Sequence, residues 1–174
     1  MSTSLTAEDI ATAIESLAAQ IRERHPAQPL TIIGIRSRGD EVAERLCTLL
    51  AADDRELNFG TLDISLYRDD FEHLRENPKL QGSDIDCPID DATVILVDDV
   101  LFTGRTIRAA LDALSDYGRS GKVELAVLID RGHREMPIQP DFVGISLATE
   151  RSDHVWVCLE STDGEDKVLV SPRS

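Results

Sequence analysis

Apolar residues recur with two different spacings along this chain, which predicts alternating helices and strands. After Thr6, apolar residues return every three or four positions until His25, so we expect an amphipathic helix with an N-cap threonine. Continuous apolar runs that suit strands buried on both faces occupy 30–35, 93–97, 123–129 and 142–145. Helical spacing between these runs predicts crossover helices over 39–50 and 104–117.

Three further patterns complete the predicted fold. Residues 57–67 alternate apolar and polar side chains, which indicates a strand with one exposed face, and the long charged segment 68–88 is typical of a functional loop. Near the end of the chain, apolar stretches at 155–159 and 168–170 flank Asp163-Gly164, a dipeptide that favours a hairpin turn. We therefore predict one α/β domain over 1–174, with a doubly wound, mostly parallel sheet, helices on both faces and a small antiparallel appendage.

The most informative segment joins the central buried strand to the helix that follows it. Asp98 and Asp99 come directly after the strand, and the sequence Thr-Gly-Arg-Thr at 103–106 opens the helix. A helix N-terminus offers free backbone amides and a positive partial charge, so this loop can hold a phosphate, and Gly104 permits close approach. Two carboxylates would repel that phosphate and suit neighbouring hydroxyls or a developing positive charge. A phosphate beside a diol is the outline of a ribose 5-phosphate.

Each part of this segment has a simpler interpretation on its own. Asp98 and Asp99 could end a solvated strand or form a Walker-B-like metal site, but a Walker B requires a G-x-x-x-x-G-K-[ST] loop, which this sequence lacks. A receiver domain also carries acidic residues after a strand, yet it does not need the Thr-Gly-Arg-Thr loop. The combination therefore favours binding of a phosphoribosyl group.

Composition restricts the class of protein and its partners. The 174 residues are 41% hydrophobic and 29% charged, as in ordinary globular proteins, and no apolar run approaches the roughly 20 residues that span a bilayer. The first residues lack the features of a secretory signal, and Cys47, Cys87 and Cys158 lack metal-site spacing, so we expect a cytoplasmic protein with reduced thiols. A net charge of −15 disfavours broad nucleic-acid contact, which depends on clustered basic side chains.

Four segments carry a resemblance to a known family. Residues 94–106 resemble the phosphoribosyl-pyrophosphate (PRPP) signature of type I phosphoribosyltransferases. The blocks at 34–39 (GIRSRG), 62–70 (LDISLYRDD) and 128–137 (LIDRGHREMP) resemble one branch, the bifunctional pyrimidine-operon attenuation regulators and uracil phosphoribosyltransferases. The resemblance runs from the first helix to Val170. It implies the type I phosphoribosyltransferase fold and conversion of uracil and PRPP to UMP and pyrophosphate.

The resemblance also implies roles for individual residues. Asp98, Asp99 and Arg38 are the expected catalytic residues, with the two carboxylates on the ribose hydroxyls and Arg38, supported by Ser37, on pyrophosphate. Arg38 has a simpler interpretation as a surface residue at a helix start. The PRPP signature loop would hold the 5-phosphate with Val100, Leu101, Phe102, Thr103, Gly104, Arg105 and Thr106.

Further contacts are implied for the base, the pyrophosphate and a metal ion. Arg68 would reach pyrophosphate from a flexible loop that closes over the site, and Arg131 and Val155 would contact uracil. Mg²⁺ is expected to bind mainly through PRPP, because it keeps waters and takes few protein ligands, and no protein metal ligand is assigned.

Regulation through RNA stays an open second function for so acidic a chain. Members of the branch bind a messenger-RNA leader, but the predicted first helix carries Glu15 and Ala19 where basic groups would help, and Ile145 stands where relatives often have lysine. The remaining candidates for RNA contact are His133, Arg134 and Arg151. The alternatives are an RNA-binding regulator with little catalysis and a transferase for another base. A homodimer or higher homo-oligomer is expected, with contacts near Tyr67.

Overall fold

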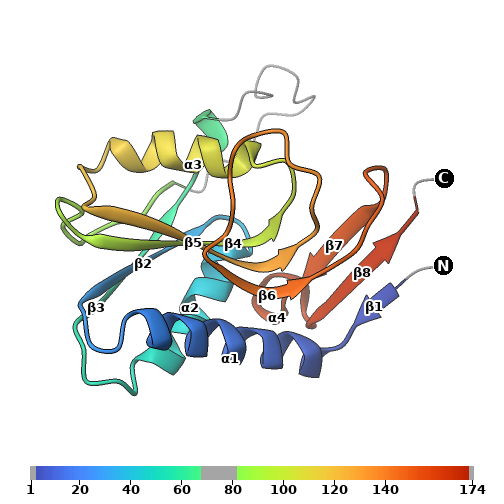
Figure 1. Ribbon diagram of the computed structural model, residues 1–174, viewed down its shortest axis with the longest axis horizontal. Helices are drawn as coiled ribbons and strands as arrows, with labels where there is room; N and C mark the ends of the chain where they lie inside the picture. The colour runs from blue at the N-terminus through green and yellow to red at the C-terminus, as the bar shows by residue number, and fades with distance from the viewer. Residues whose placement is uncertain (1–2, 68–81, 173–174) are drawn as a thin grey trace.

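The computed structural model describes residues 3–67 and 82–172, which form a parallel sheet between helices with a smaller sheet beside it (Figure 1). The large sheet has the order β3-β2-β4-β5-β6, and every neighbouring pair is parallel. Its strands are β2 (Leu30–Ile35), β3 (Leu57–Leu62), β4 (Thr93–Leu101), β5 (Lys122–Asp130) and β6 (Phe142–Ser146). Helices α1 (Ala7–Arg24) and α2 (Gly39–Leu50) cover one face and α3 (Arg105–Ser115) covers the other, so the doubly wound prediction is confirmed.

The parallel strands are apolar on both sides because each face of the sheet has its own core. In β4, Ile95 and Val97 pack in the core that includes α1 and α2, whereas Val94 and Leu96 pack in the core that includes α3. All four side chains are fully buried. This double burial explains the uninterrupted apolar run that predicted the strand.

Helix α1 starts where the sequence predicts. The Thr6 hydroxyl accepts from the Asp9 amide at 3.2 Å, and the Asp9 carboxylate accepts from the Thr6 amide at 2.8 Å, which is a reciprocal capping box. One stripe of the helix is buried against the sheet and consists of Ile10, Ala13, Ile14, Leu17, Ala18 and Ile21. The predicted amphipathic helix is therefore confirmed.

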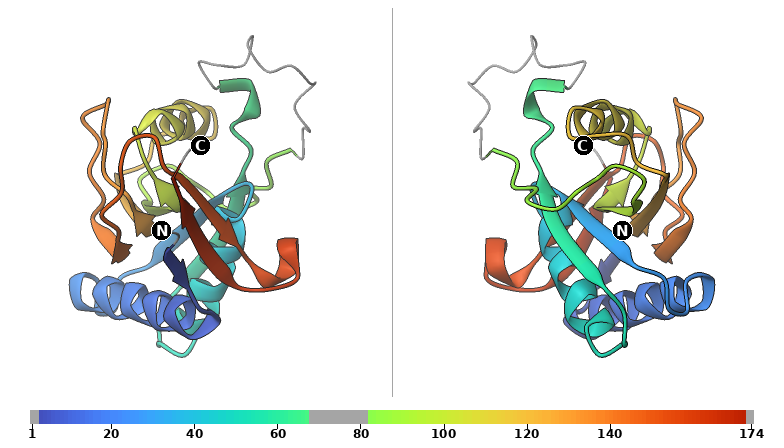
Figure 2. Two further views of the ribbon diagram at one scale, coloured as in Figure 1. Left: turned by 90° about the vertical axis from the view of Figure 1, so that its right-hand side faces the viewer. Right: turned by 90° about the vertical axis from the view of Figure 1, so that its left-hand side faces the viewer.

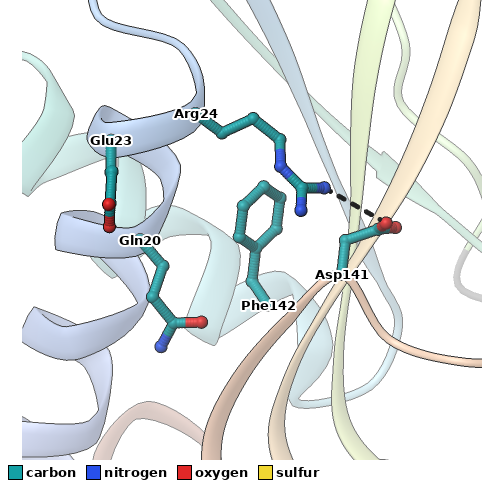
Figure 3. Close-up of a pocket in the computed structure, with 5 residues that line it drawn as sticks. All are labelled: Gln20, Glu23, Arg24, Asp141 and Phe142. Carbon is teal, nitrogen blue, oxygen red and sulfur yellow. Dashed lines mark hydrogen bonds and ion pairs between the residues drawn. The ribbon is translucent and has the colours of Figure 1, made fainter.

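The end of α1 is fastened to the amino ends of β5 and β6. A hollow of about 340 Å³ lies there, lined by the residues drawn in Figure 3. The Arg24 guanidinium lies 4.9 Å from the centre of the Phe142 ring and donates to Asp141 at 3.2 Å. Arg24 also donates to the buried Glu124 at 2.9 Å, and the His25 ring nitrogen lies 2.7 Å from the other Glu124 oxygen. This end of the sheet is opposite to the carboxyl ends at which α/β proteins bind ligands.

The predicted antiparallel appendage is present, with two differences. It consists of β1 (Thr3–Leu5), β8 (Lys167–Ser171) and β7 (His154–Cys158) in that order, and the left view of Figure 2 looks onto it. The N-terminal strand was not predicted, because three residues carry too little pattern. The predicted hairpin is present, since β7 and β8 pair antiparallel, but its connection is longer than a tight turn: a short helix α4 (Glu160–Asp163) joins the two strands, and Gly164 ends it in the left-handed conformation, with φ 83°.

The strand predicted over 57–67 ends five residues early. β3 stops at Leu62 because the Asp63 carboxylate accepts hydrogen bonds from the amide and hydroxyl of Ser65, at 2.9 and 2.7 Å, and so closes a turn. A 3₁₀ turn, Ser65–Tyr67, follows, and the Tyr67 hydroxyl donates to Asp116 at the end of α3. Most of the predicted long loop, 68–81, lies outside the described residues, as does Arg68.

Close packing between β2 and α2 leads to a prediction about stability. A methyl group added at Gly34 would lie 2.5 Å from the Asp40 Cα and 2.8 Å from the Ala43 Cβ. Because backbone cannot yield as a flexible side chain does, we expect Gly34→Ala to lower the free energy of unfolding by about 1–3 kcal/mol. Urea unfolding followed by circular dichroism measures this change, and an unaltered midpoint would contradict the close approach of strand and helix.

Candidate functional site

The residues singled out in the sequence lie at the carboxyl ends of three adjacent strands. The turn 36–38 follows β2, Asp98 and Asp99 lie near the end of β4, and Arg131 follows β5. These strands are neighbours in the order β2-β4-β5, so their ends meet at one edge of the sheet. β4 continues to Leu101, four residues beyond the predicted end, and therefore includes both carboxylates.

The two carboxylates are held close together inside the protein. Asp98 is only 4% exposed and Asp99 is half-buried. The Asp98 carboxylate accepts from the Asp99 amide at 2.9 Å, and the Asp99 carboxylate accepts from the Val100 amide at 2.8 Å. Burial, and then the charge of Asp99, raises the pKa of Asp98 well above its usual range. Burial also raises the pKa of Asp99, although Arg38 opposes this rise. A positive charge close to this pair would therefore be stabilised.

The turn after β2 packs directly against this acidic pair. Arg38 has a left-handed φ of 74°, which a residue other than glycine rarely adopts, and the Arg36–Ser37 peptide bond is cis. The next residue, Gly39, begins α2, and a methyl group there would lie 2.7 Å from the Val97 carbonyl oxygen and 3.0 Å from the Asp98 Cα. Only glycine allows the turn to approach the carboxylates this closely.

The Arg38 guanidinium is engaged by an acidic residue from the small sheet. Its Nε and Nη2 donate to the two oxygens of Asp163, at 3.0 and 2.8 Å. Arg38 and Asp163 also line a hollow of about 560 Å³ together with Asp99 and Val155. The rest of the described lining comes from β7 and β8 and consists of Trp156, Val157, Cys158, Lys167 and Leu169. This contact could not be predicted from the sequence, in which Asp163 was assigned only to the turn of a hairpin.

The predicted phosphate loop leads into a helix end that no side chain caps. Gly104 precedes α3 with a left-handed φ of 91°, and the helix has no side-chain cap. The first helical hydrogen bond runs from the Arg108 amide to the Gly104 carbonyl, at 3.0 Å, and the Arg105 amide donates to the Thr103 hydroxyl at 3.3 Å. The first amides of a helix have no carbonyl four residues back, so this end can receive an anion.

A neighbouring segment, residues 131–138, holds the carbonyl oxygens of this loop. The Leu101 carbonyl accepts from the Arg131 amide at 3.1 Å, and the Phe102 carbonyl accepts from the Arg134 guanidinium at 2.9 Å. The Thr103 carbonyl accepts from the amides of Glu135 and Met136, at 2.8 and 3.0 Å. Three successive carbonyls are thus fixed by one segment. Arg134 also pairs with Asp130 at 2.8 Å, and this bracing role was not evident from the sequence.

Of the two residues expected to contact the uracil base, one lines the hollow and the other does not. Val155 is half-buried and lines the hollow beside Arg38 and Asp99, whereas Arg131 is not part of the described lining. The Arg131 side chain is buried, with its guanidinium 4.0 Å from the centre of the Phe102 ring and a hydrogen bond of 3.0 Å to the Glu150 carbonyl. Burial lowers the pKa of Arg131, and its Nε has no hydrogen-bond partner within the described residues.

Two of the three candidates for RNA contact are engaged inside the protein. The His133 ring nitrogen lies 2.6 Å from the Thr149 carbonyl oxygen, and Arg134 braces the loop described above. Arg151 is the one that presents its side chain to solvent, at 61% exposure, although it pairs with Glu135 at 3.0 Å.

Within residues 3–67 and 82–172, no three His, Cys, Asp or Glu side chains gather closely enough to hold a metal ion. Over the same residues, no helix combines the length and apolar character needed to cross a membrane.

Comparison with known proteins agrees with this architecture. The phosphoribosyl transferase domain matches residues 2–162. The chain is 52% identical over 170 residues to the bifunctional protein PyrR of Desulfosudis oleivorans, covering 96% of this chain and 94% of that protein. It is 47% identical over 168 residues to the bifunctional protein PyrR of Chloroflexus aurantiacus, covering 95% and 92%.

The solved structures show the same fold at low sequence identity. A hypoxanthine phosphoribosyltransferase of Trypanosoma cruzi matches with a TM-score of 0.72 at 20% identity, covering 97% of this chain and 95% of that one. The fold is thus that of the type I phosphoribosyltransferases, and the sequence matches extend over nearly the whole chain. The chain belongs to the phosphoribosyltransferase family and, within it, to the bifunctional PyrR proteins.

Proposed function

We propose that the protein transfers the phosphoribosyl group of PRPP to uracil, giving UMP and pyrophosphate, and that one domain over 1–174 performs the reaction. The observation that carries this proposal is the position of the acidic pair. Asp98 and Asp99 lie on β4, which leads into the uncapped N-terminus of α3, and next to the turn that carries Arg38. A diol site, an anion site and a guanidinium therefore share one edge of the sheet.

The ribose is the centre of the proposed reaction. The bond between its anomeric carbon and pyrophosphate breaks, the bond to uracil N1 forms, and the sugar passes through a state with oxocarbenium character. Asp99 lines the hollow and would contact the ribose hydroxyls, while Asp98 beneath it adds negative charge. The raised pKa values of both carboxyl groups support this role, because a developing cation offsets the cost of burying their negative charge.

The 5-phosphate would be bound by the segment 100–106. Backbone amides at the start of α3 and the hydroxyls of Thr103 and Thr106 are the donors, and Gly104 gives room for the anion. Residues 131–138 hold the loop carbonyls and so keep the amides oriented before the substrate arrives. A bound phosphate fixes one end of the substrate while the anomeric carbon moves towards the base.

The departing pyrophosphate would be bound by Arg38 and Ser37, with Arg68 contributing from beyond the described residues. The adjacent carboxylates of Asp98 and Asp99 supply the oxygen atoms that suit a hard cation, and burial, which raises the pKa of both groups, makes a neutralising charge favourable there. Mg²⁺, bound mainly through PRPP oxygens, would neutralise the charge of the leaving group. The N1 proton of uracil, which is lost as the new bond forms, is acidic enough that no side chain is assigned as a general base.

Base recognition is assigned to Arg131 and Val155. The Arg131 guanidinium packs on Phe102, which belongs to the phosphate loop, so base binding and phosphate binding share a structural element. Competition among uracil, orotate and purine bases tests this assignment. Preferred turnover of another base would replace uracil in the proposal.

A second proposed function is regulation of the pyrimidine operon by RNA attenuation, with UMP as the sensed nucleotide. The bifunctional name of the relatives supports it, and the exposed Arg151 is the surviving candidate for RNA contact. We also propose a cytoplasmic homodimer or higher oligomer. Leu66 and Tyr67 are 64% and 37% exposed and suit a contact between copies.

The first prediction of the proposed function concerns activity. Purified protein with uracil, PRPP and Mg²⁺ should release one pyrophosphate for each UMP formed, and omission of any one of the three should abolish release. A coupled pyrophosphate assay with chromatography of UMP measures both products. Absence of turnover above background would refute the transferase assignment.

The second prediction separates the roles of the two carboxylates. We expect Asp99→Asn to lower kcat/KM for PRPP by about 100-fold, the usual scale for a lost electrostatic contact in a transition state. Asp98→Asn should also lower activity, and in addition it should stabilise the protein at neutral pH, because it removes a buried carboxylate. Full activity in both folded variants would contradict the ribose assignment.

The sign of the stability change follows from proton binding. The pKa of Asp98 is higher in the folded protein than in the unfolded chain. The contribution of this carboxyl group to the stability of the wild type is therefore lost as pH rises through its folded pKa. Asparagine does not ionise, so the advantage of Asp98→Asn should be greatest near neutral pH and should disappear below about pH 4. Chemical unfolding across this pH range provides the measurement.

The third prediction concerns the regulator. A specific complex with pyrimidine-operon leader RNA should tighten when UMP is added, and its affinity should depend only modestly on salt, because so acidic a protein makes few phosphate contacts. Filter binding at two salt concentrations, with a scrambled RNA as control, provides the measurement. No binding even at low salt would eliminate this function.

A further inference from the structure

The connection between β7 and β8 reaches the turn before α2 through one ion pair. The Asp163 carboxylate accepts from Nε and Nη2 of Arg38 at 3.0 and 2.8 Å, which is the planar two-point pairing that suits arginine. Asp163 is itself fixed, because its carboxylate also accepts from the Leu159 amide at 2.8 Å. The side chains of Arg38 and Asp163 are 33% and 20% exposed, so the pair is partly shielded from water.

This pairing determines which part of Arg38 can meet a ligand. A guanidinium has two edges that can bind an anion at two points, and Asp163 occupies the edge formed by Nε and Nη2. Nη1 lies 3.5 Å from the Ser37 hydroxyl, on the residue proposed to support pyrophosphate binding. Since Arg38, Asp99 and Asp163 line one hollow, the carboxylate fixes the orientation of the guanidinium within the site.

We propose that Asp163 is a positioning residue that holds Arg38 in the orientation that binds pyrophosphate. This inference rests on the proposed transferase function and assigns a role in it to the small antiparallel sheet. The hydrogen bond to Arg38 lowers the pKa of Asp163, and the same bond raises the pKa of Arg38, so both partners stay charged at neutral pH.

A purely structural role for Asp163 predicts a different outcome, and the protein contains a matched control. Arg38, Glu41 and Arg45 are three and four residues apart and contact the same β7–β8 connection. Arg45 pairs with Asp166 at 2.7 and 2.8 Å, and Asp166 accepts from the Glu160 amide at 2.8 Å. Asp166 thus fastens the small sheet as Asp163 does, but without contacting Arg38.

The test compares Asp163→Asn with Asp166→Asn in the full chain. We expect Asp163→Asn to raise the KM for PRPP and the product-inhibition constant of pyrophosphate about tenfold, because a displaced arginine loses its alignment with the leaving group. The KM for uracil should change less than about twofold, and Asp166→Asn should leave all three constants near wild type. Urea unfolding of both variants shows whether their stabilities are comparable. If Asp163→Asn is the less stable, Asp163→Glu, which keeps the charge, should restore most of the PRPP affinity.

A double variant tests whether Asp163 acts through Arg38. Once Arg38→Ala has removed the guanidinium, adding Asp163→Asn should cause no further loss of PRPP affinity, so the two effects should not add. Additive losses, equal constants for Asp163→Asn and Asp166→Asn, or tighter PRPP binding by Asp163→Asn would overturn the inference. Tighter binding would mean that the carboxylate competes with pyrophosphate. Wild-type protein that released no pyrophosphate would instead refute the transferase function itself.

Discussion

The arrangement of the candidate site depends on two carboxylates kept side by side at the buried end of a strand. Burial raises the pKa of both Asp98 and Asp99, and the charge of Asp99 raises the pKa of Asp98 further, so the folded protein maintains a pair that opposes its own ionisation. No packing requirement explains such a pair, since apolar residues would fill the same place more stably. Its surroundings instead bring donors close to it: a helix N-terminus along the chain and an arginine across a glycine contact.

The loop after this pair is oriented by its neighbours before any ligand binds. Carbonyl oxygens of Leu101, Phe102 and Thr103 accept hydrogen bonds from residues 131–136, through one guanidinium and three amides. Fixing the carbonyls also fixes the peptide planes, and with them the direction of the amides. Arg134, a candidate for RNA contact in the sequence, is thus engaged in holding the loop 100–106.

The small sheet contributes more than a cover for the apolar core. Val157 and Val168 pack into the core beneath α1 and α2, while Trp156, Lys167 and Leu169 line the hollow that contains Arg38 and Asp99. One hairpin thus contributes both to the core and to the candidate site, and Val157 takes part in both. Its connection adds Asp163, which contacts Arg38 in the turn after β2.

The sequence by itself determined the α/β class, the bounds of β2 and α2, the start of α1 and the place of the acidic pair before a helix, because local spacing and capping encode each of these. The local pattern predicted too long a strand at β3, where the Asp63 side chain closes a turn. It also missed β1, three residues that form a strand only by pairing with the distant β8. Only the tertiary structure decided that Arg134 holds a carbonyl of the loop 100–106, that the Arg131 guanidinium packs on the Phe102 ring, and that Asp163 pairs with Arg38. These contacts join residues far apart in the chain, and no periodicity records which distant partner a charged side chain will meet.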